Sequence, residues 1–187
     1  MKDTMKTPPK ILSSKIVART AVFTIEQQKL RFANGTTVHY EHMVGSERGA
    51  VLIVPLLNDD TVLLIREYAA GVQRYELALP KGSLDVGETL LEAANREMME
   101  EIGYGARLLT HIKSLSVSPG YLDHMTHVIV ARDLYENRLS GDEPEPIEVV
   151  PFSLSRFEEL FEREDFTEAR TIAALYMVRD HYLKKPA

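Results

Sequence analysis

The sequence predicts an α/β protein: an α/β/α sandwich around a mixed sheet, preceded by a small N-terminal antiparallel sheet. Three features of the residue pattern lead to this fold class. Segments with strand character follow one another along most of the chain, one helix interrupts them near the middle, and two helices follow near the C-terminal end. A sheet that is apolar on both faces needs helices on each side, and this order of elements supplies them.

Length and composition indicate one full domain with a small addition. The 187 residues suit a single packed core, so we divide the chain into an N-terminal extension, residues 1–45, and a main domain, residues 46–187. Apolar residues make up 44% and charged residues 27%, the balance of an ordinary soluble protein. Cysteine is absent, which excludes disulfides and thiolate metal sites.

Charge and hydropathy bear on location and partners. No apolar run approaches the length of a membrane-spanning helix, and the N-terminus lacks the apolar core of a signal peptide. We therefore expect a cytoplasmic protein with no membrane partner. The net charge of −6 argues against nucleic acid as a partner, because both molecules are negative.

The N-terminal extension contains a predicted antiparallel sheet from Ile16 to Val44. Apolar residues alternate over Val22–Ile25 and Leu30–Phe32, and Asn34-Gly35 is a strong signal for a hairpin turn before the chain returns. Residues 1–10 are polar, so we expect them to be loosely ordered.

The main domain opens with a predicted buried strand. Ala50–Leu57 is a continuous apolar run, and we expect Thr61–Tyr68 to be its partner across the turn at Asn58–Asp60. Further strands are predicted at Leu108–Val117, Met125–Ala131 and Ile147–Phe152.

Two predicted helices follow the last strand. Ser155–Arg163 forms a short amphipathic helix, and Asp165 with Glu168 resembles a capping box that opens a longer one, reaching about Lys184. We expect this last helix to be purely structural, because it presents a broad apolar face made of Ile172, Leu175, Tyr176, Val178 and Tyr182.

The helix in the middle of the chain has clear boundaries. Thr89 followed by Glu92 forms a capping box at its start, and Gly103 can take the left-handed conformation that ends a helix. The expected buried face is a stripe of four apolar residues at helical spacing: Leu91, Ala94, Met98 and Ile102.

Three glutamates crowd onto an adjacent face of this helix. Glu97, Glu100 and Glu101 lie at i, i+3 and i+4, and each pair of like charges at such spacing costs about 0.2–0.5 kcal/mol. Only Arg96 offsets them within the helix, and Glu88 lies in a glycine-bracketed loop that can fold back to the same place. A hard divalent cation with oxygen ligands, Mg²⁺ first, would neutralise this cluster. The alternative interpretation is a solvated acidic face.

The acidic helix belongs to a longer pattern. Gly82 is followed after five residues by Glu88 and after seven more by Arg96-Glu97, with Glu100-Glu101 and Gly103 behind them. At every fixed position this pattern resembles the Nudix box, G-x5-E-x7-R-E-U-x-E-E-x-G-U, in which U is apolar. The resemblance implies the Nudix fold, hydrolysis of a nucleoside diphosphate linked to another group, and Mg²⁺ or Mn²⁺ as cofactor.

Two neighbouring runs resemble the branch of the family that hydrolyses ADP-ribose. Arg66 to Ala69 is similar to its R-Q-Y-R pattern, and the run that ends at Lys81-Gly82 is similar to E-L-P-A-G. Ala69 stands where that pattern has a second arginine, and Lys81 stands where it has alanine. This resemblance gives four candidate substrate-binding residues: Arg66, Glu76, Ser83 and Pro119. For Arg66 the alternative is a surface charge on an edge strand.

The resemblance also assigns catalytic roles. Glu97 and Glu101 would hold the metal, with Glu100 or Glu88 and the carbonyl of Lys81 completing its shell. Glu100 is the first choice to activate water, and Arg96 is expected to orient Glu88 or another carboxylate. Relatives carry a glutamate base four residues past the glycine of a Ser-Pro-Gly loop. Here Pro119 lies in such a loop, but His124 occupies that position and Asp123 precedes it, so both are alternative bases.

Over nearly its whole length the chain resembles the ADP-compounds hydrolases of the NudE type. These enzymes cleave the diphosphate of ADP-ribose, NADH and diadenosine polyphosphates and release AMP from the first two.

Relatives are dimeric, so the N-terminal sheet is either a dimerisation and adenosine-binding element or only a cap. The acidic loop Gly141–Pro146 is expected to be exposed, with a flap over the site as the alternative. Two other functions stay open: a nucleotide sensor that does not cleave, and a nucleoside triphosphate pyrophosphatase.

Overall fold

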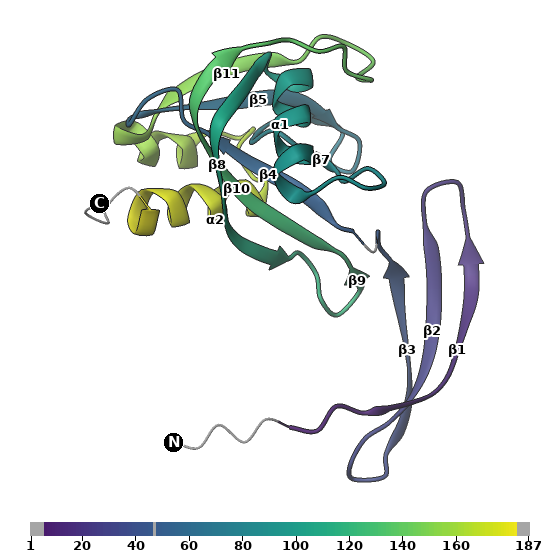
Figure 1. Cartoon of the computed structure of the whole chain (residues 1–187). Helices are drawn as coiled ribbons and strands as arrows, with labels where there is room; N and C mark the ends of the chain where they lie inside the picture. The colour runs from purple at the N-terminus through teal and green to yellow at the C-terminus, as the bar shows by residue number, and fades with distance from the viewer. Residues whose placement is uncertain (1–5, 47, 183–187) are drawn as a thin grey trace. The chain divides into compact units, whose positions relative to one another are not determined.

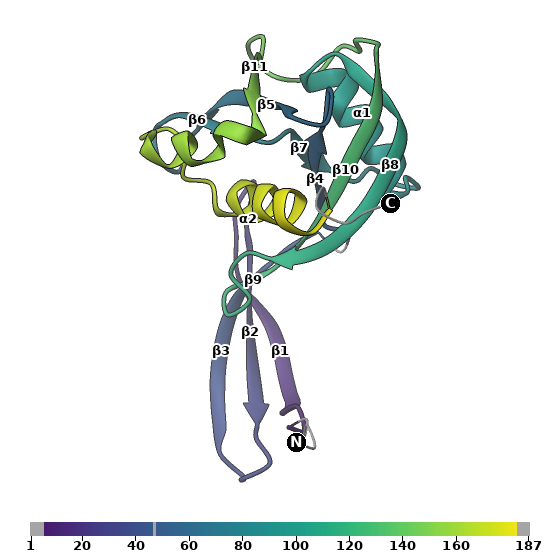
Figure 2. The same cartoon turned by 90° about the vertical axis from the view of Figure 1, so that its left-hand side faces the viewer.

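The computed structural model describes residues 6–46 and 48–182, and the chain divides into two compact units. The N-terminal unit contains the residues up to 47 together with residues 116–124, and the larger unit contains residues 48–115 and everything from 125 onwards. Each unit has its own sheet structure, drawn in Figures 1 and 2.

The N-terminal unit is a four-stranded sheet with the order β1-β2-β3-β9. Its strands are β1 (Lys10–Arg19), β2 (Thr24–Arg31), β3 (Thr37–Val44) and the short β9 (Leu122–Asp123). Strands β1 to β3 are antiparallel, and β9 joins β3 in parallel. The predicted hairpin turn is confirmed, because Gly35 has a φ of +84° between β2 and β3.

The predicted strand boundaries in this unit were partly wrong. The sheet begins at Lys10, before the expected start at Ile16, and β2 begins at Thr24. Val22 and Phe23 lie in the preceding turn, where their backbone N–H groups donate to the hydroxyl of Thr20 at 3.2 and 2.8 Å. Both apolar side chains are exposed, so alternation of residue types misplaced them in a strand.

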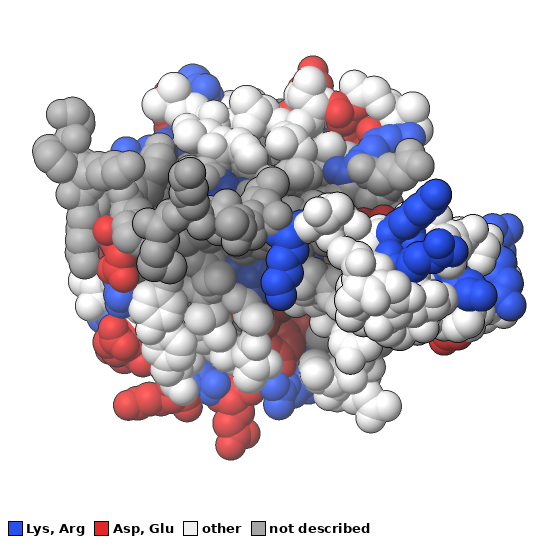
Figure 3. Space-filling view, turned by 90° about the horizontal axis from the view of Figure 1, so that it is seen from below, with Lys and Arg blue, Asp and Glu red and all other residues white. Residues whose placement is uncertain are grey.

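The N-terminal unit is basic, although the chain as a whole is acidic. Its described residues, 6–46 and 116–124, contain six Lys or Arg and three Asp or Glu, whereas the whole chain has a net charge of −6. The residues are Lys6, Lys10, Lys15, Arg19, Lys29 and Arg31 against Glu26, Glu41 and Asp123. Figure 3 shows a group of Lys and Arg side chains gathered at the right of the view.

The larger unit contains two sheets. The mixed sheet has the order β7-β4-β10-β8, and the antiparallel sheet has the order β11-β5-β6. The mixed sheet consists of β7 (Lys81–Ser83), β4 (Ala50–Pro55), β10 (Met125–Glu136) and β8 (Tyr104–Ser116). The antiparallel sheet consists of β11 (Glu148–Ser153), β5 (Thr61–Ala69) and β6 (Arg74–Ala78).

The predicted partnership of β4 with β5 was wrong. Strand β4 pairs in parallel with β10 and antiparallel with β7, while β5 pairs with β6 and β11. Only a single bridge, Leu56 to Val62, joins the ends of the two neighbours. The turn between them is closed by the side chain of Asn58, which accepts from the N–H groups of Asp60 and Thr61, and it sends the chain into the other sheet.

The predicted α/β/α arrangement is confirmed at β4. Every residue of this strand is buried, and its side chains point alternately to the two faces of the sheet. Val51 and Ile53 belong to the core cluster that contains Met98 of α1 (Leu90–Glu101), whereas Leu52 and Val54 belong to the cluster that contains Leu175 of α2 (Ala169–Met177). Figures 1 and 2 show the two helices on opposite sides of β4 and β10. The strand is therefore covered on both faces, as its unbroken apolar run requires.

Helix α1 has the predicted ends. The hydroxyl of Thr89 accepts from the N–H of Glu92 at 3.3 Å, the carboxylate of Glu92 accepts from the N–H of Thr89 at 2.8 Å, and Gly103 has a φ of +77°. The predicted buried stripe was wrong at Leu91, which is 39% exposed, while Ala93 is fully buried. The packed face is thus rotated slightly from the one that the apolar residues alone suggested.

The two predicted C-terminal helices are present, but only part of their length is α-helical. The 3₁₀-helix η1 (Leu154–Glu162) precedes α2, and the π-helical turn η2 (Val178–Tyr182) follows it. Glu168 caps α2 by accepting from the N–H of Thr171 at 2.7 Å, but Asp165 is not part of the cap, because it pairs with Arg163 and Arg66. The predicted end at Lys184 lies outside the described residues. Within the described part of the chain, no helix has the length and apolar character needed to cross a membrane.

Replacing Thr89 by alanine should lower the free energy of unfolding by about 1 kcal/mol, because the N–H of Glu92 loses its acceptor. In a protein of this size that corresponds to a fall in melting temperature of about 2–4 °C, measurable by circular dichroism. Thr89→Ser keeps the hydroxyl and serves as the control. An alanine variant that melts like the parent would contradict the role of the cap.

Candidate active site

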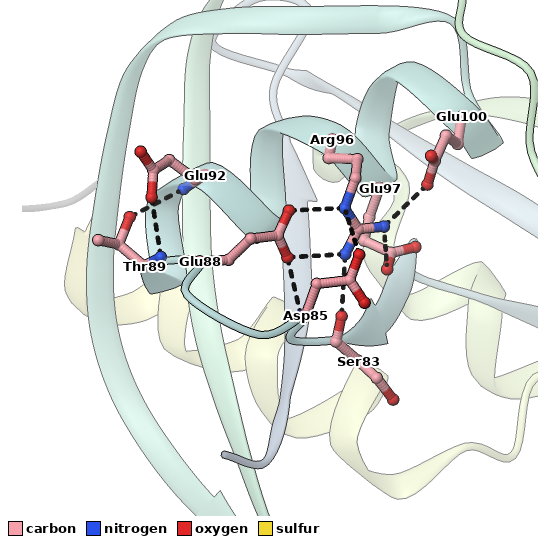
Figure 4. A network of polar contacts seen from close by, with 8 residues as sticks. All are labelled: Ser83, Asp85, Glu88, Thr89, Glu92, Arg96, Glu97 and Glu100. Atoms are coloured by element: carbon pink, nitrogen blue, oxygen red, sulfur yellow. Dashed lines mark hydrogen bonds and ion pairs between the residues drawn. The ribbon is translucent and has the colours of Figure 1, made fainter.

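The box residues are fixed to the centre of the larger unit from two sides. Strand β7 pairs with β4 and so anchors Gly82 against the mixed sheet. Helix α1 packs through Ala94 and Met98 on the same side of β4, which leaves its glutamates at the edge of that contact. Figure 4 shows the loop between β7 and α1 folding back, so that Glu88 faces Arg96.

Arg96 is the centre of the polar network. Its Nε and Nη2 donate to the two carboxylate oxygens of Glu88 at 2.7 and 3.0 Å, and its Nη1 donates to Glu97 at 2.8 Å and to Glu100 at 2.9 Å. A fifth hydrogen bond runs from Nη2 to the carbonyl of Ser83 at 3.0 Å. These contacts, chiefly those with Glu88, raise the pKa of Arg96 further above its ordinary value. The guanidinium therefore orients the box carboxylates, as the sequence predicted.

Glu101 is the most deeply buried carboxylate of the box, with 4% of its surface exposed. One of its oxygens accepts from the backbone N–H of Lys81 at 3.0 Å. Burial raises the pKa of Glu101 to about 8, although the charge of Lys81 and this hydrogen bond act in the opposite direction. The site thus holds a carboxylate whose negative charge is only partly compensated by the protein.

Glu97 lies against Gly82. A Cβ atom at position 82 would come within 1.9–2.2 Å of the carboxylate atoms of Glu97, so only glycine leaves room for that group. Burial raises the pKa of Glu97, an effect that Arg96 opposes. The first glycine of the box therefore has a steric role here, because the absence of a side chain at position 82 leaves room for the carboxylate of Glu97 beside β7.

Glu88 and Glu100 complete the acidic group in different ways. Glu88 accepts from the N–H of Asp85 at 2.9 Å in addition to Arg96, and its hydrogen bonds with Arg96 lower its pKa. Glu100 shares Nη1 of Arg96 with Glu97 and lines an open cleft of about 450 Å³. The cleft is bounded by Lys81, Gly82, Ser83, Asp85, Arg96, Glu97, Glu100 and residues 140–143.

The acidic loop contributes the far wall of this cleft. Gly141–Pro146 is exposed, as predicted, yet Asp142 and Glu143 lie opposite the box, and the charge of Asp142 contributes to raising the pKa of Glu97. Lys81 is the second cation of the cleft, and its ammonium group pairs with Glu67 of β5. The loop and Glu67 were not among the predicted site residues. The run of acids at 142–145 was the signal for the loop, whereas nothing local pointed to Glu67.

The chemistry of these donors fits a hard divalent cation. Glu101 is buried and Glu97 is partly buried, both have raised pKa values, and the carboxylate of Glu97 occupies the space that Gly82 leaves beside β7. Oxygen donors of this kind are the ligands that Mg²⁺ and Mn²⁺ prefer. Among residues 6–46 and 48–182, no three Asp, Glu or His side chains form a ready-made cage, since Arg96 and the N–H of Lys81 engage the box carboxylates instead.

Two candidate substrate-binding residues have strong partners within the protein. Arg66 pairs with Glu148 at 2.9 Å and also with Asp165. Glu76 is 6% exposed and accepts from the N–H and hydroxyl of Thr167 at 3.2 and 2.9 Å. Ser83 lines the cleft and contributes its carbonyl to Arg96. Substrate binding by these residues stays a prediction.

The remaining candidates belong to the N-terminal unit. Asp123 lies in β9, in register with Val44 of β3, and His124 and Pro119 lie in the same segment, residues 116–124. Their roles as bases or substrate contacts stay predictions, and so does the role of the N-terminal sheet.

The comparison with known protein families agrees with this description of the site. The model of the NUDIX domain matches residues 46–175, which include the whole box and all residues that line the cleft. The chain belongs to the Nudix family. A second model, the NudE-type Nudix hydrolase N-terminal domain, matches residues 9–42 of the N-terminal sheet. Nudix hydrolases generally use divalent metal ions, which agrees with the donor set described above.

Similar proteins support the same Nudix assignment over nearly the whole length. The chain is 48% identical to ADP compounds hydrolase NudE of Escherichia coli (strain K12) over 172 residues, 92% of each chain. It is 28% identical to the ADP-ribose pyrophosphatase of Bacillus subtilis (strain 168), covering 89% of this chain and 92% of that one. A solved structure described as an ADP compounds hydrolase superposes with a TM-score of 0.89 at 47% identity, covering 96% of both chains.

Glu101→Gln should stabilise the metal-free protein at about pH 8. The folded-state pKa of Glu101 lies above its ordinary value of 4.5, so folding becomes less favourable as the pH rises from about 5 to 8 and this carboxyl loses its proton. Glutamine removes that dependence while keeping an acceptor for the N–H of Lys81. In chelator at pH 8 the gain should be on the order of 1–4 kcal/mol, and it should shrink towards pH 5. Thermal melts across this range test it, and a variant that is less stable at pH 8 would contradict it.

Proposed function

We propose that the protein is a pyrophosphohydrolase that cleaves the diphosphate bridge of ADP-linked compounds. The observation that carries the proposal is the complete box in the larger unit. Arg96 binds Glu88, Glu97 and Glu100, and Glu97 and Glu100 line the cleft together with Gly82. Glu101 accepts from the N–H of Lys81. The substrates in this proposal are ADP-ribose, NADH and diadenosine polyphosphates, and the first two release AMP. Support for this class comes from the similarity to the relative named ADP compounds hydrolase, which extends over 92% of both chains.

The cofactor in this proposal is Mg²⁺, with Mn²⁺ as a second choice. Glu97 and Glu101 would hold it, because burial raises the pKa of both carboxylates, and Glu100 or Glu88 with the carbonyl of Lys81 would supply further oxygens. When bound, a divalent cation neutralises phosphate charge and makes water more acidic.

The side chains around the cleft have separate roles in the proposed reaction. Arg96 holds Glu88, Glu97 and Glu100 in a fixed arrangement, so it acts as a positioning residue. Glu100 lines the cleft, and we assign it the acceptance of a proton from the attacking water. Asp123 and His124 are the alternative bases. Lys81 on one side of the cleft attracts the diphosphate, and the acidic loop on the other side repels it. Together they orient the diphosphate in the cleft.

A substrate panel tests this function against the two alternatives. With Mg²⁺, the purified protein should release AMP from ADP-ribose and NADH and should cleave diadenosine triphosphate. Glu101→Gln should lower kcat at least about 100-fold with the fold intact, since it removes a buried anion from the metal site. Glu162→Gln, an exposed carboxylate in η1, is the matched control. Turnover of dGTP alone would favour a nucleoside triphosphate pyrophosphatase, and binding without any turnover would favour a nucleotide sensor.

We also propose that the protein is a homodimer formed through its N-terminal sheet. Several large apolar side chains of this unit are more than 40% exposed, namely Ile11, Ile16, Val17, Phe23 and Tyr40. A second copy paired through the same surface would cover these apolar side chains. Light scattering should give twice the chain mass of 21.2 kDa, and a monomer at micromolar concentration would contradict the proposal. The cytoplasmic location remains a prediction from composition.

A further inference from the structure

A second cleft of the larger unit is lined by two tyrosines that face one another. Tyr68 of β5 and Tyr75 of β6 are direct partners in the strand register, and their rings meet edge to face with centroids 5.5 Å apart. The side chains are 50% and 46% exposed. Aromatic surface of this size, open to solvent inside a cleft, offers flat apolar faces on which another ring can stack.

The opposite wall of this cleft is the end of the acidic loop. The cleft has a volume of about 530 Å³, and Pro144, Pro146 and Ile147 add apolar surface across from the tyrosines. The hydroxyl of Tyr75 donates to Glu145, which ties the β5–β6 hairpin to the loop. Such a space is large enough for a purine or pyridine ring with part of its ribose.

The charges of the cleft disfavour a phosphate and favour a neutral or cationic group. Glu143, Glu145 and Glu148 supply carboxylate oxygens, which are acceptors only. The one arginine in the lining, Arg66, is already paired with Glu148 and Asp165. A ligand that matches these walls is flat and carries N–H donors, such as the amino group of adenine or the carboxamide of nicotinamide.

This tyrosine cleft adjoins the box cleft. Glu143 lines both of them, and Glu67 lines the tyrosine cleft while its carboxylate binds the ammonium of Lys81 in the box cleft. A molecule whose diphosphate lies against α1 therefore has an adjoining place for the group at one of its ends.

We propose that the cleft lined by Tyr68 and Tyr75 on one side and the acidic loop on the other binds a planar heterocycle at one end of the diphosphate substrate. The inference rests on the proposed function, because it takes a nucleoside diphosphate as the ligand of the box cleft. It makes the two tyrosines specificity-determining residues. The tyrosine faces supply stacking, and the glutamates of the loop accept hydrogen bonds from the exocyclic nitrogen of the ring.

Kinetics on three substrates test the proposal. Tyr68→Ala and Tyr75→Ala should each raise KM about tenfold, within the range expected for loss of one aromatic stacking contact, while kcat changes little. Tyr68→Phe and Tyr75→Phe keep the rings and should restore most of the affinity. Phe161→Ala, which removes a partly exposed aromatic ring of η1 outside the cleft, is the control for surface truncation.

The pattern across substrates identifies the ring. A rise in KM for NADH and diadenosine triphosphate but not for ADP-ribose assigns the cleft to the base on the second half of the molecule. A rise for all three assigns it to the adenine that they share. Unchanged KM values for all three, or equal losses in the phenylalanine variants, would overturn the proposal.

A binding measurement separates this proposal from the proposed function. Saturation-transfer NMR with adenosine and with nicotinamide riboside needs no turnover, and at least one of them should show contact with the protein that is lost in Tyr68→Ala and in Tyr75→Ala. If the protein cleaves none of the three compounds but these contacts appear, the function fails and the ring site stands. If cleavage occurs with no tyrosine-dependent contact and no change in KM, the ring site fails and the function stands.

Discussion

The site depends on one guanidinium group that holds three carboxylates near one another. Glu88, Glu97 and Glu100 would repel if they were brought together alone, and Arg96 binds all three with hydrogen bonds of 2.7–3.0 Å. Arginine suits this task because its planar fork presents five N–H donors and stays charged at all relevant pH values. The loop before α1, the helix and the end of β7 are joined through this one side chain.

The scaffold supplies what the guanidinium cannot. Strand β4 is buried on both faces, so α1 and β7 are fixed against it with little freedom. This rigidity allows Glu101 to remain buried with a raised pKa and Glu97 to occupy the space that Gly82 leaves. Excess negative charge held in a fixed place is what a divalent cation can neutralise, and it ties the stability of the fold to the chemistry of the site.

In our proposals, residues from separate segments of the chain together recognise the substrate. The β5–β6 hairpin brings Tyr68 and Tyr75, β7 brings Lys81, and the acidic loop brings Glu143 to both clefts. Lys81 adds a positive charge to the box cleft and is held by Glu67 of β5. The balance of charge along the cleft is therefore set by residues from different strands.

The sequence by itself determined the local features: the capping box at Thr89, the left-handed end at Gly103, the turn at Gly35 and the two-sided burial of β4. The turn and the helix ends follow from neighbouring residues and short-range backbone preferences, and the burial of β4 follows from its unbroken apolar run. Tertiary structure decided the rest. It placed β5 in the other sheet, exposed Leu91 and drew Asp165 away from the cap towards Arg66, because strand partners and ion pairs far apart in sequence compete with local signals. The spacing of the box was enough to predict its members. Glu67 and the acidic loop are far from the box in sequence, so only the fold shows that they lie at its edge.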